Sequence, residues 1–276
     1  MQPRALVTDE HHARTAARAP LVLRALPALL AIASALASAC ASVAPHGSAP
    51  CPTQIHFGGL DWSVSNAAER FPGAARGFAW NECNVKIESL ADGQSVLVLS
   101  LRKEAHGWRG AQIESENTFQ YGTFALATES SLRPMLVDSP SAVLGFFAYV
   151  GPAYANEIDM EFTRWGNPAI PPMHYTVWHN VKGGATPNPE SSFASGVDSE
   201  FVRPALHRFI WTDHAVTFGS SARDRGAPIG RPFIVHANVP TKPMHIMLNL
   251  WVERQANMGT ATEYEVRISS VTHTVP

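Results

Sequence analysis

The sequence predicts an all-β protein built as a sandwich of two antiparallel sheets. Roughly a dozen segments have the apolar or alternating pattern of strands, and no stretch has the periodicity of a convincing amphipathic helix. The chain has 276 residues with 19 glycines and 21 prolines, which is typical of many turns, and 45% of its residues are hydrophobic. The clearest alternation runs through Asn156–Phe162. One large core with strands on both sides is therefore the expected architecture.

Residues 1–39 predict a signal peptide rather than part of the fold. Arg14, Arg18 and Arg24 supply positive charge ahead of an uncharged apolar run. Ala37-Ser38-Ala39 then fits the small-x-small pattern of a cleavage site. The apolar run is too short for a comfortable membrane span. We therefore expect an exported protein that is extracellular, periplasmic or anchored to a membrane.

The three cysteines follow this segment. Cys40 comes directly after the expected cleavage site, and the sequence before it looks like a loose bacterial lipoprotein signal. Lipidation of Cys40, with membrane attachment, and simple secretion are both open. Residues 40–50 are expected to be a linker or tether, and 51–276 the folded domain. Cys51 and Cys83 are then an even pair, which favours a disulfide in an oxidising compartment, with two buried thiols as the alternative.

Several segments ahead of residue 156 have strand character. They are 84–87, 95–101, 108–115, 119–124 and 142–150. The first two are joined across Ala91-Asp92-Gly93, which is a hairpin signal. Ala142–Val150 is apolar throughout and predicts a fully buried strand.

Further strands are expected after the acidic segment. They are 173–178, 207–212, 215–218, 233–235, 244–251 and 262–271. Met173–Trp178 should lie beside the acidic strand as its return strand. Lys182–Ser199 is rich in Gly, Pro, Asn and Ser and predicts a mobile loop.

The acidic strand carries the functional signal. In a β-strand, Glu157, Asp159 and Glu161 point to one face while the apolar residues between them point to the other. Acids are rare in strands, and three on one face repel each other, so some functional gain should offset that cost. The alternative is a solvated strand face that is acidic without a function.

Glycoside hydrolysis offers such a gain, because it commonly uses two carboxyl groups on either side of the scissile bond. A middle carboxylate raises the proton affinity of its neighbours, which helps to keep one outer acid protonated near neutral pH. Along a flat strand, the Cα atoms of Glu157 and Glu161 lie about 13 Å apart. Retaining enzymes need carboxyl groups roughly 5–5.5 Å apart and inverting ones about 6.5–9.5 Å, so the spacing alone leaves the stereochemistry open.

Glu-Ile-Asp-Met-Glu-Phe closely resembles the signature of glycoside hydrolase family 16. The resemblance implies a jelly-roll β-sandwich of two antiparallel sheets with a concave substrate cleft, and a retaining mechanism. It also implies that Glu157 is the nucleophile, Asp159 an assisting residue and Glu161 the acid/base.

A softer resemblance extends from about Phe57 to Ile268. It includes a tryptophan-containing hairpin at 208–218 and a late strand that ends in Asn249-Leu250-Trp251. Where many members have an aromatic-x-Asp-Gly turn, this chain has Phe218-Gly219-Ser220-Ser221. The acceptor side of the cleft is therefore expected to differ.

Aromatic side chains are candidate sugar platforms, since sugars present apolar C–H faces to flat rings. Trp108, Trp165, Trp178 and Trp251 fall at strand ends or loops near the acidic strand, with core packing as the alternative. Arg109 is a candidate for hydrogen bonds to sugar hydroxyls or for an ion pair with an acid.

Other functional classes are disfavoured. The net charge is −2 and no basic stripe is present, which argues against a nucleic-acid partner. The histidines are scattered, so we expect no catalytic metal and no cofactor, while a structural calcium ion is left open.

The sequence therefore predicts an endo-acting retaining hydrolase of a β-linked polysaccharide, either a β-1,3/1,4-glucan or a galactan, which acts as a monomer. The alternatives are a lectin-like carbohydrate-binding module without activity, and a transglycosylase on the same scaffold.

Overall fold

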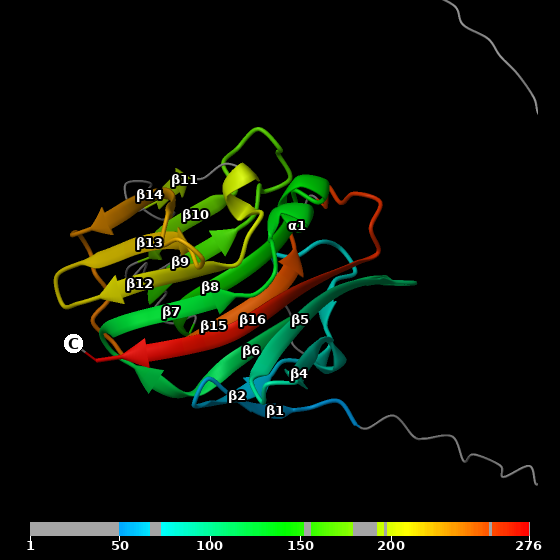
Figure 1. The fold of residues 1–276 in the computed structure, drawn as a ribbon, viewed down its shortest axis with the longest axis horizontal. Helices are drawn as coiled ribbons and strands as arrows, with labels where there is room; N and C mark the ends of the chain where they lie inside the picture. Colours follow the sequence, from blue (N-terminus) through cyan, green and yellow to red (C-terminus); the bar gives the residue numbers. More distant parts are fainter. Residues whose placement is uncertain are drawn as a thin grey trace, which may run out of the picture. The chain divides into compact units, whose positions relative to one another are not determined.

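The computed structural model describes residues 50–66, 73–151, 156–178, 192–195, 198–253 and 256–275. These residues belong to one compact unit, Ala49–Pro276. They form the two-layered all-β sandwich that the sequence predicts (Figure 1). The predicted signal peptide, Cys40 and all of the linker except its last residue lie outside the described residues.

The strands account for most of the fold. From the N-terminus to the acidic segment they are β1 (Gln54–Phe57), β2 (Leu60–Val64), β3 (Ala79–Trp80), β4 (Val85–Ser89), β5 (Ser95–Glu104), β6 (Gly107–Phe119), β7 (Gly122–Thr128), β8 (Ala142–Val150) and β9 (Asn156–Phe162). They continue as β10 (Met173–Trp178), β11 (Ser192–Ser195), β12 (Ala205–Trp211), β13 (Val216–Ala222), β14 (Pro228–Val235), β15 (Met244–Val252) and β16 (Glu263–Thr274). One short helix, α1 (Arg133–Asp138), and two 3₁₀ turns, η1 (Glu82–Asn84) and η3 (Asp198–Phe201), lie between them.

Hydrogen bonds join the strands into one continuous sheet, and this sheet folds over into two layers. The first sheet has the order β11-β10-β9-β8-β15-β6-β2-β1, and the second has the order β4-β5-β16-β7-β12-β13-β14. The β5–β6 hairpin passes from one sheet to the other. All pairs are antiparallel except the short one between β3 and β6. In Figure 1 the red strand β16 runs between β5 and β7, as the ladder requires.

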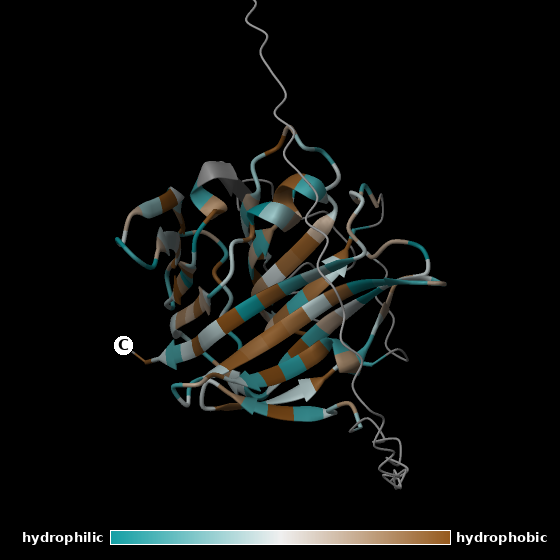
Figure 2. Cartoon of the chain, turned by 45° about the vertical axis from the view of Figure 1, so that its right-hand side comes forward, coloured by the Kyte–Doolittle hydropathy of each residue, from teal (hydrophilic) through white to brown (hydrophobic). Residues whose placement is uncertain are grey.

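The hydrophobic core fills the space between the two sheets. Phe146 of β8 packs against Phe209 of β12, with ring centroids 5.4 Å apart. Tyr175 of β10 stacks on Phe218 of β13 at 4.9 Å. Figure 2 shows hydrophobic and hydrophilic bands alternating along the strands, as expected when each strand turns one face to the core. Each sheet therefore has a core face and an outer face.

Strand β9 has the predicted bounds and the predicted alternation. Ile158, Met160 and Phe162 are fully buried in the core, which places the three acids on the outer face of the first sheet. β10 also has the predicted bounds, and it pairs with β9 as expected. The sequence thus predicts correctly both the strand and the face that carries the acids.

Two expectations about the chain between the strands are wrong. The predicted loop Lys182–Ser199 contains strand β11 at Ser192–Ser195, because these residues pair with the free edge of β10; most of the rest of that segment lies outside the described residues. Helix α1 was not expected, and its six residues are too few to show an amphipathic repeat. The helix present in the described residues is too short to cross a membrane.

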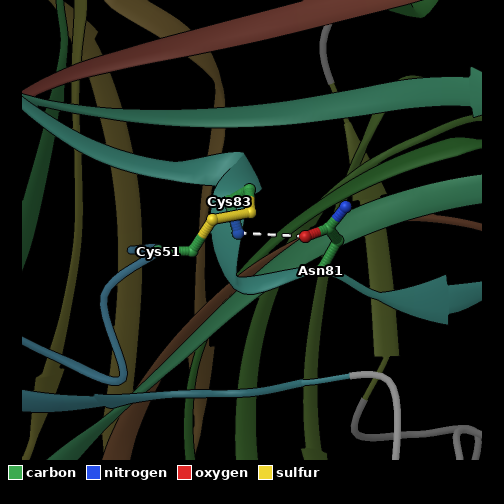
Figure 3. Close-up of a disulfide and its surroundings, with 3 residues drawn as sticks. All are labelled: Cys51, Asn81 and Cys83. Carbon is green, nitrogen blue, oxygen red and sulfur yellow. Dashed lines mark hydrogen bonds between the residues drawn. A yellow bond between two sulfur atoms is a disulfide. The ribbon is translucent and has the colours of Figure 1, made fainter. Parts of the chain in front are cut away.

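The predicted disulfide between Cys51 and Cys83 is confirmed (Figure 3). It links two positions that are 32 residues apart in sequence. Cys83 lies in η1, whose first turn is capped by Asn81: the backbone N–H of Cys83 donates to the Asn81 side chain. The bond ties the start of the described domain to the segment that leads into β4.

Candidate active site

The three acids lie at the centre of ordered rows that run across the first sheet. Antiparallel neighbours that are directly opposite point to the same face, so the register fixes these rows. From β10 to β15, the rows are Trp178–Glu157–Tyr149–His245, Thr176–Asp159–Phe147–Met247 and His174–Glu161–Gly145–Asn249. The second and third rows continue on β6 with Glu114 and Gln112. We call this surface the acidic face.

The acidic face is not a flat surface open to water. Asp159 is only 4% exposed, and His174, Thr176, Gln112 and Asn249 are also buried although they point away from the core. Glu157 and Glu161 are partly buried. The carboxyl groups are therefore largely removed from solvent, which excludes the alternative of a solvated acidic strand.

Asp159 is held by two hydrogen bonds. The indole N–H of Trp178 donates to its Oδ2 atom over 2.5 Å. A second hydrogen bond joins the carboxyl groups of Asp159 and Glu157. Burial, followed by the negative charges of Glu157 and Glu161, raises the pKa of Asp159 well above its usual value. The hydrogen bond with Glu157 raises the pKa of Asp159 further, whereas the one from Trp178 lowers it.

The two outer acids differ in proton affinity. Burial raises the pKa of Glu161 to about 8, and the charge of Glu157 adds to the effect. Burial also raises the pKa of Glu157, to about 7, but its hydrogen bond with Asp159 opposes this rise. Glu157 consequently ionises before Glu161, so a pH range exists in which one is a carboxylate and the other a carboxylic acid.

Aromatic rings gather beside Glu161. The rings of Trp165 and Trp251 lie 6.2 Å apart, and Trp165 lies 5.9 Å from His174, the cross-strand neighbour of Glu161. Trp251 packs in a small cluster with Trp80 and Val143. Trp165 is a non-glycine residue with a φ of 49°, a strained conformation that is often found at functional sites. The structure thus brings Trp165, Trp178 and Trp251 to the acidic face.

The structure does not bring Trp108 and Arg109 to this face. Trp108 is buried in the main core and stacks on Tyr264 of β16 at 6.5 Å. The Arg109 guanidinium donates to the carbonyl of Gly77 and pairs with Glu104. Their described contacts are with the second sheet and with the segment before β4. The reason is the β5–β6 hairpin, which carries the start of β6 into the second sheet.

Other residues of the acidic face were not identified from the sequence as site residues. Phe147 and Tyr149 lie directly opposite Asp159 and Glu157 on β8. Burial, together with the charges of Glu157 and Glu114, raises the pKa of Tyr149. Both residues stand in an apolar run that predicts a fully buried strand, and only the pairing of β8 with β9 shows which of its residues face the acids.

Asn249 and Gln112 form a polar network at the far end of the Glu161 row. Gln112 donates to the hydroxyl of Ser65, and Asn249 approaches Gln112 at 3.5 Å. The side-chain oxygen of Asn249 is buried without a hydrogen-bond partner. A side chain at Gly145 would meet that oxygen at 2.5 Å. Glycine is therefore required between Glu161 and Asn249.

Within the described part of the chain, no group of three or more His, Cys, Asp or Glu side chains is arranged to hold a metal ion. The acidic face itself presents carboxyl groups that differ in proton affinity, flanked by aromatic rings and amides.

No model of a protein family and no curated protein matches the sequence. Solved structures do resemble the fold. A β-1,3-1,4-glucanase (lichenase) from a mouse hindgut metagenome superposes with a TM-score of 0.57 at 19% identity, covering 78% of this chain and 93% of that one.

Two further structures give similar values. The β-glucanase of Bacillus licheniformis has a TM-score of 0.56 at 18% identity and covers 82% of this chain and 96% of its own. A glycoside hydrolase family 16 endo-glucanase from Bacteroides ovatus has a TM-score of 0.55 at 14% identity, covering 77% and 94%. The likeness shows that this chain has the fold of the family 16 endo-glucanases.

Proposed function

We propose that the chain is an exported, retaining glycoside hydrolase of family 16 that cleaves a β-linked glucan internally. One observation carries the proposal: Glu157, Asp159 and Glu161 share the outer face of β9, while the residues between them are buried in the core. The fold shared with glucanases supports it, although it does not by itself establish an activity.

In the first step of the proposed reaction, Glu157 attacks the anomeric carbon of the bound sugar. The glycosidic C–O bond breaks as a bond to the Glu157 carboxylate forms, and Glu161 gives its proton to the leaving oxygen. The order of the pKa values suits these roles, since Glu157 ionises at about 7 and Glu161 at about 8. Asp159 stabilises the ionised form of Glu157 through their hydrogen bond.

In the second step, a water molecule attacks the same carbon. Glu161, now a carboxylate, takes a proton from this water, and the bond to Glu157 breaks. The sugar leaves with its original anomeric configuration, and both acids return to their starting protonation states. A sugar hydroxyl in place of water would give transglycosylation, which uses the same groups.

The substrate proposal is a neutral β-1,3/1,4-glucan. Of the similar structures, one is a β-1,3-1,4-glucanase and another is an endo-glucanase. In addition, the three rows of the acidic face hold no lysine or arginine at the positions in register with Glu157, Asp159 and Glu161. These positions offer no lysine or arginine to a sulfated galactan, which supports a neutral glucan as the substrate.

Export rests on two features. The Cys51–Cys83 disulfide suits an oxidising compartment. The N-terminal sequence has the pattern of a signal peptide, with Cys40 as a candidate for lipid attachment. We propose that the domain acts outside the cytoplasm as a monomer, with membrane attachment if Cys40 is lipidated.

The test replaces each outer acid by its amide. Glu157→Gln and Glu161→Gln should each lower the release of reducing ends from mixed-linkage glucan by about 10²- to 10⁴-fold. Glu263→Gln is the matched control, because Glu263 is an exposed acid that pairs with Arg102 on the second sheet, and it should keep full activity. Circular dichroism checks that all three variants are folded.

Two outcomes would contradict the assignment. If either outer-acid variant turns over glucan at the wild-type rate, the roles are wrong. If the wild type binds glucan but releases no reducing ends, the chain is a lectin-like binding module. The anomer that is released first, followed by proton NMR, tests retention separately.

A further inference from the structure

Trp178 makes a contact that a sugar platform does not need. Its position in β10 is directly opposite Glu157, yet its side chain reaches diagonally to the neighbouring row. There the indole N–H donates to Asp159 Oδ2 at 2.5 Å. Indole has a single polar hydrogen, so this hydrogen bond leaves it none for a sugar hydroxyl.

This hydrogen bond determines which oxygen of Asp159 accepts and which one donates. A protonated carboxyl group has one O–H and one carbonyl oxygen. Because the indole N–H can only donate, the oxygen facing Trp178 must be the acceptor. The proton of Asp159 is then on the other oxygen, where it is available to Glu157, with which Asp159 shares its second hydrogen bond.

The same contact also stabilises Asp159 when it ionises. Asp159 is almost completely buried between two other acids. The hydrogen bond from Trp178 opposes the effect of these neighbours on the proton affinity of Asp159. Trp178 is therefore placed to support both protonation states of Asp159 while fixing its orientation.

We propose that Trp178 is a positioning residue that orients Asp159 toward Glu157 through its indole N–H, and not primarily a sugar-stacking platform. The inference rests on the proposed function for its kinetic consequences, but the hydrogen bond itself can be tested on the free protein.

The first experiment measures the hydrogen bond without substrate. In a ¹⁵N–¹H spectrum of the protein labelled at tryptophan, the indole signal that disappears in Trp178→Phe is that of Trp178. We expect this signal to lie downfield in the wild type and to move upfield in Asp159→Ala, which removes the acceptor. Asp159→Asn keeps a neutral acceptor and should give an intermediate shift. A Trp178 signal that is the same in the wild type and both variants would overturn the proposal, whether or not the protein hydrolyses glucan.

The second experiment measures the effect on catalysis. Trp178→Phe keeps an aromatic ring but loses the donor, so kcat should fall by about 3- to 10-fold, the range expected when a hydrogen bond to an uncharged carboxyl group is lost. The acidic limb of the pH–kcat profile should move to higher pH, because Glu157 loses the hydrogen bond that lowers its pKa. Trp178→His retains an N–H donor and should recover part of the rate.

The matched control is Trp211→Phe. Trp211 also donates its indole N–H, to the carbonyl of Pro240, but it does so in the core at the end of β12. This variant should lose stability and keep the wild-type pH profile. If Trp178→Phe instead raises KM at unchanged kcat and leaves the pH profile in place, Trp178 is a sugar platform and the proposal is wrong.

Discussion

Acidic side chains have opposite kinds of surroundings on the outer faces of the two sheets. On the second sheet, Glu263 pairs with Arg102 at 2.6 Å, and Glu88 pairs with Arg267 at 2.8 Å. Glu129, beside them, hydrogen-bonds Ser269 and pairs with Arg223, and these contacts lower its pKa. Glu129 is thus stabilised as a carboxylate, and Glu263 and Glu88 each have an arginine partner.

On the acidic face, none of the residues directly opposite Glu157, Asp159 and Glu161 is an arginine or a lysine. Burial raises the pKa of Glu161, where arginine and serine lower that of Glu129. Both side chains are glutamates on the surface of the same sandwich. The difference is that the second sheet pairs its acids with arginines, whereas the first sheet buries three acids side by side, a kind of arrangement that is often found at functional sites.

The largest effect is expected from a methyl group added to the acidic face. In Gly145→Ala the new Cβ meets the side-chain oxygen of Asn249 at 2.5 Å, so the buried Asn249 side chain beside Glu161 must move. We expect a loss of about 1–3 kcal/mol in unfolding free energy and a marked fall in kcat. Urea denaturation and glucan hydrolysis measure the two effects.

Gly219→Ala is the control on the other face. Nothing lies within 4 Å of a Cβ at Gly219 on β13, so stability and activity should both stay close to those of the wild type. Equal losses in the two variants would mean that the two faces do not differ in packing, and the comparison would fail.

A second prediction concerns pH and activity. Catalysis needs Glu157 ionised and Glu161 protonated, so the rate should peak between their pKa values of about 7 and about 8. It should fall about tenfold for each pH unit beyond either limb. A pH–kcat profile measured from pH 5 to pH 10 tests this. A flat plateau centred near pH 4 to 5 would show that both acids behave like the ordinary carboxyl groups of the second sheet.

A third prediction concerns pH and stability. The folded state raises the pKa of Glu161 from 4.5 to about 8, so its protonated form adds stability below pH 4.5 that is lost as the pH rises to about 8. Glu161→Gln should therefore match the wild type at pH 4 and be more stable than the wild type at pH 9, where the fold must hold a buried carboxylate.

Glu129 should show the opposite sign, because its pKa is lowered in the folded state. Ionised Glu129 therefore stabilises the fold at pH values above its pKa in the unfolded state. This stabilisation is lost as the pH falls through its pKa in the folded state. Glu129→Gln should therefore be less stable than the wild type at pH 7 and equal to it at low pH. Denaturant titrations at three pH values compare the two variants, and equal signs at neutral pH would refute the contrast.

The sequence predicts the part of this comparison that depends on local alternation. The period of two in β9 is enough to assign the acids to one face and Ile158, Met160 and Phe162 to the core. It is also enough to predict β10 as the neighbouring strand. These features follow from the alternating direction of side chains in a strand and from the short connection between neighbouring strands. Both can be recognised from the residues of the segment itself.

The remaining parts of the site depend on pairing between distant strands. Asn249 reaches the Glu161 row because β15 lies between β8 and β6, a neighbourhood that joins residues more than 100 positions apart. Trp108 does not lie at the site because β6 begins in the second sheet. Neither fact has a local signal. Position near strand ends therefore predicts that Trp165, Trp178 and Trp251 lie at the acidic face but wrongly places Trp108 there, and sugar binding by the first three stays a prediction.

The smallest effect is expected for charged substrates. A like charge near the acidic face costs about 1 kcal/mol at the surface, so Glu157→Gln should bind a sulfated β-glucan about three- to tenfold more weakly than the unmodified polymer. Raising the salt concentration should reduce this difference in affinity between the two polymers, since salt screens exposed charges.

Two further variants test where the charge acts. Glu114→Gln, added to Glu157→Gln, should reduce the difference in affinity further, because Glu114 lies on the acidic face. Glu263→Gln, added in the same way, removes an equal charge from the second sheet and should leave the ratio unchanged. Affinity electrophoresis with both polymers gives the ratios, and tighter binding of the sulfated glucan would show that residues beyond the three rows determine the charge of the site.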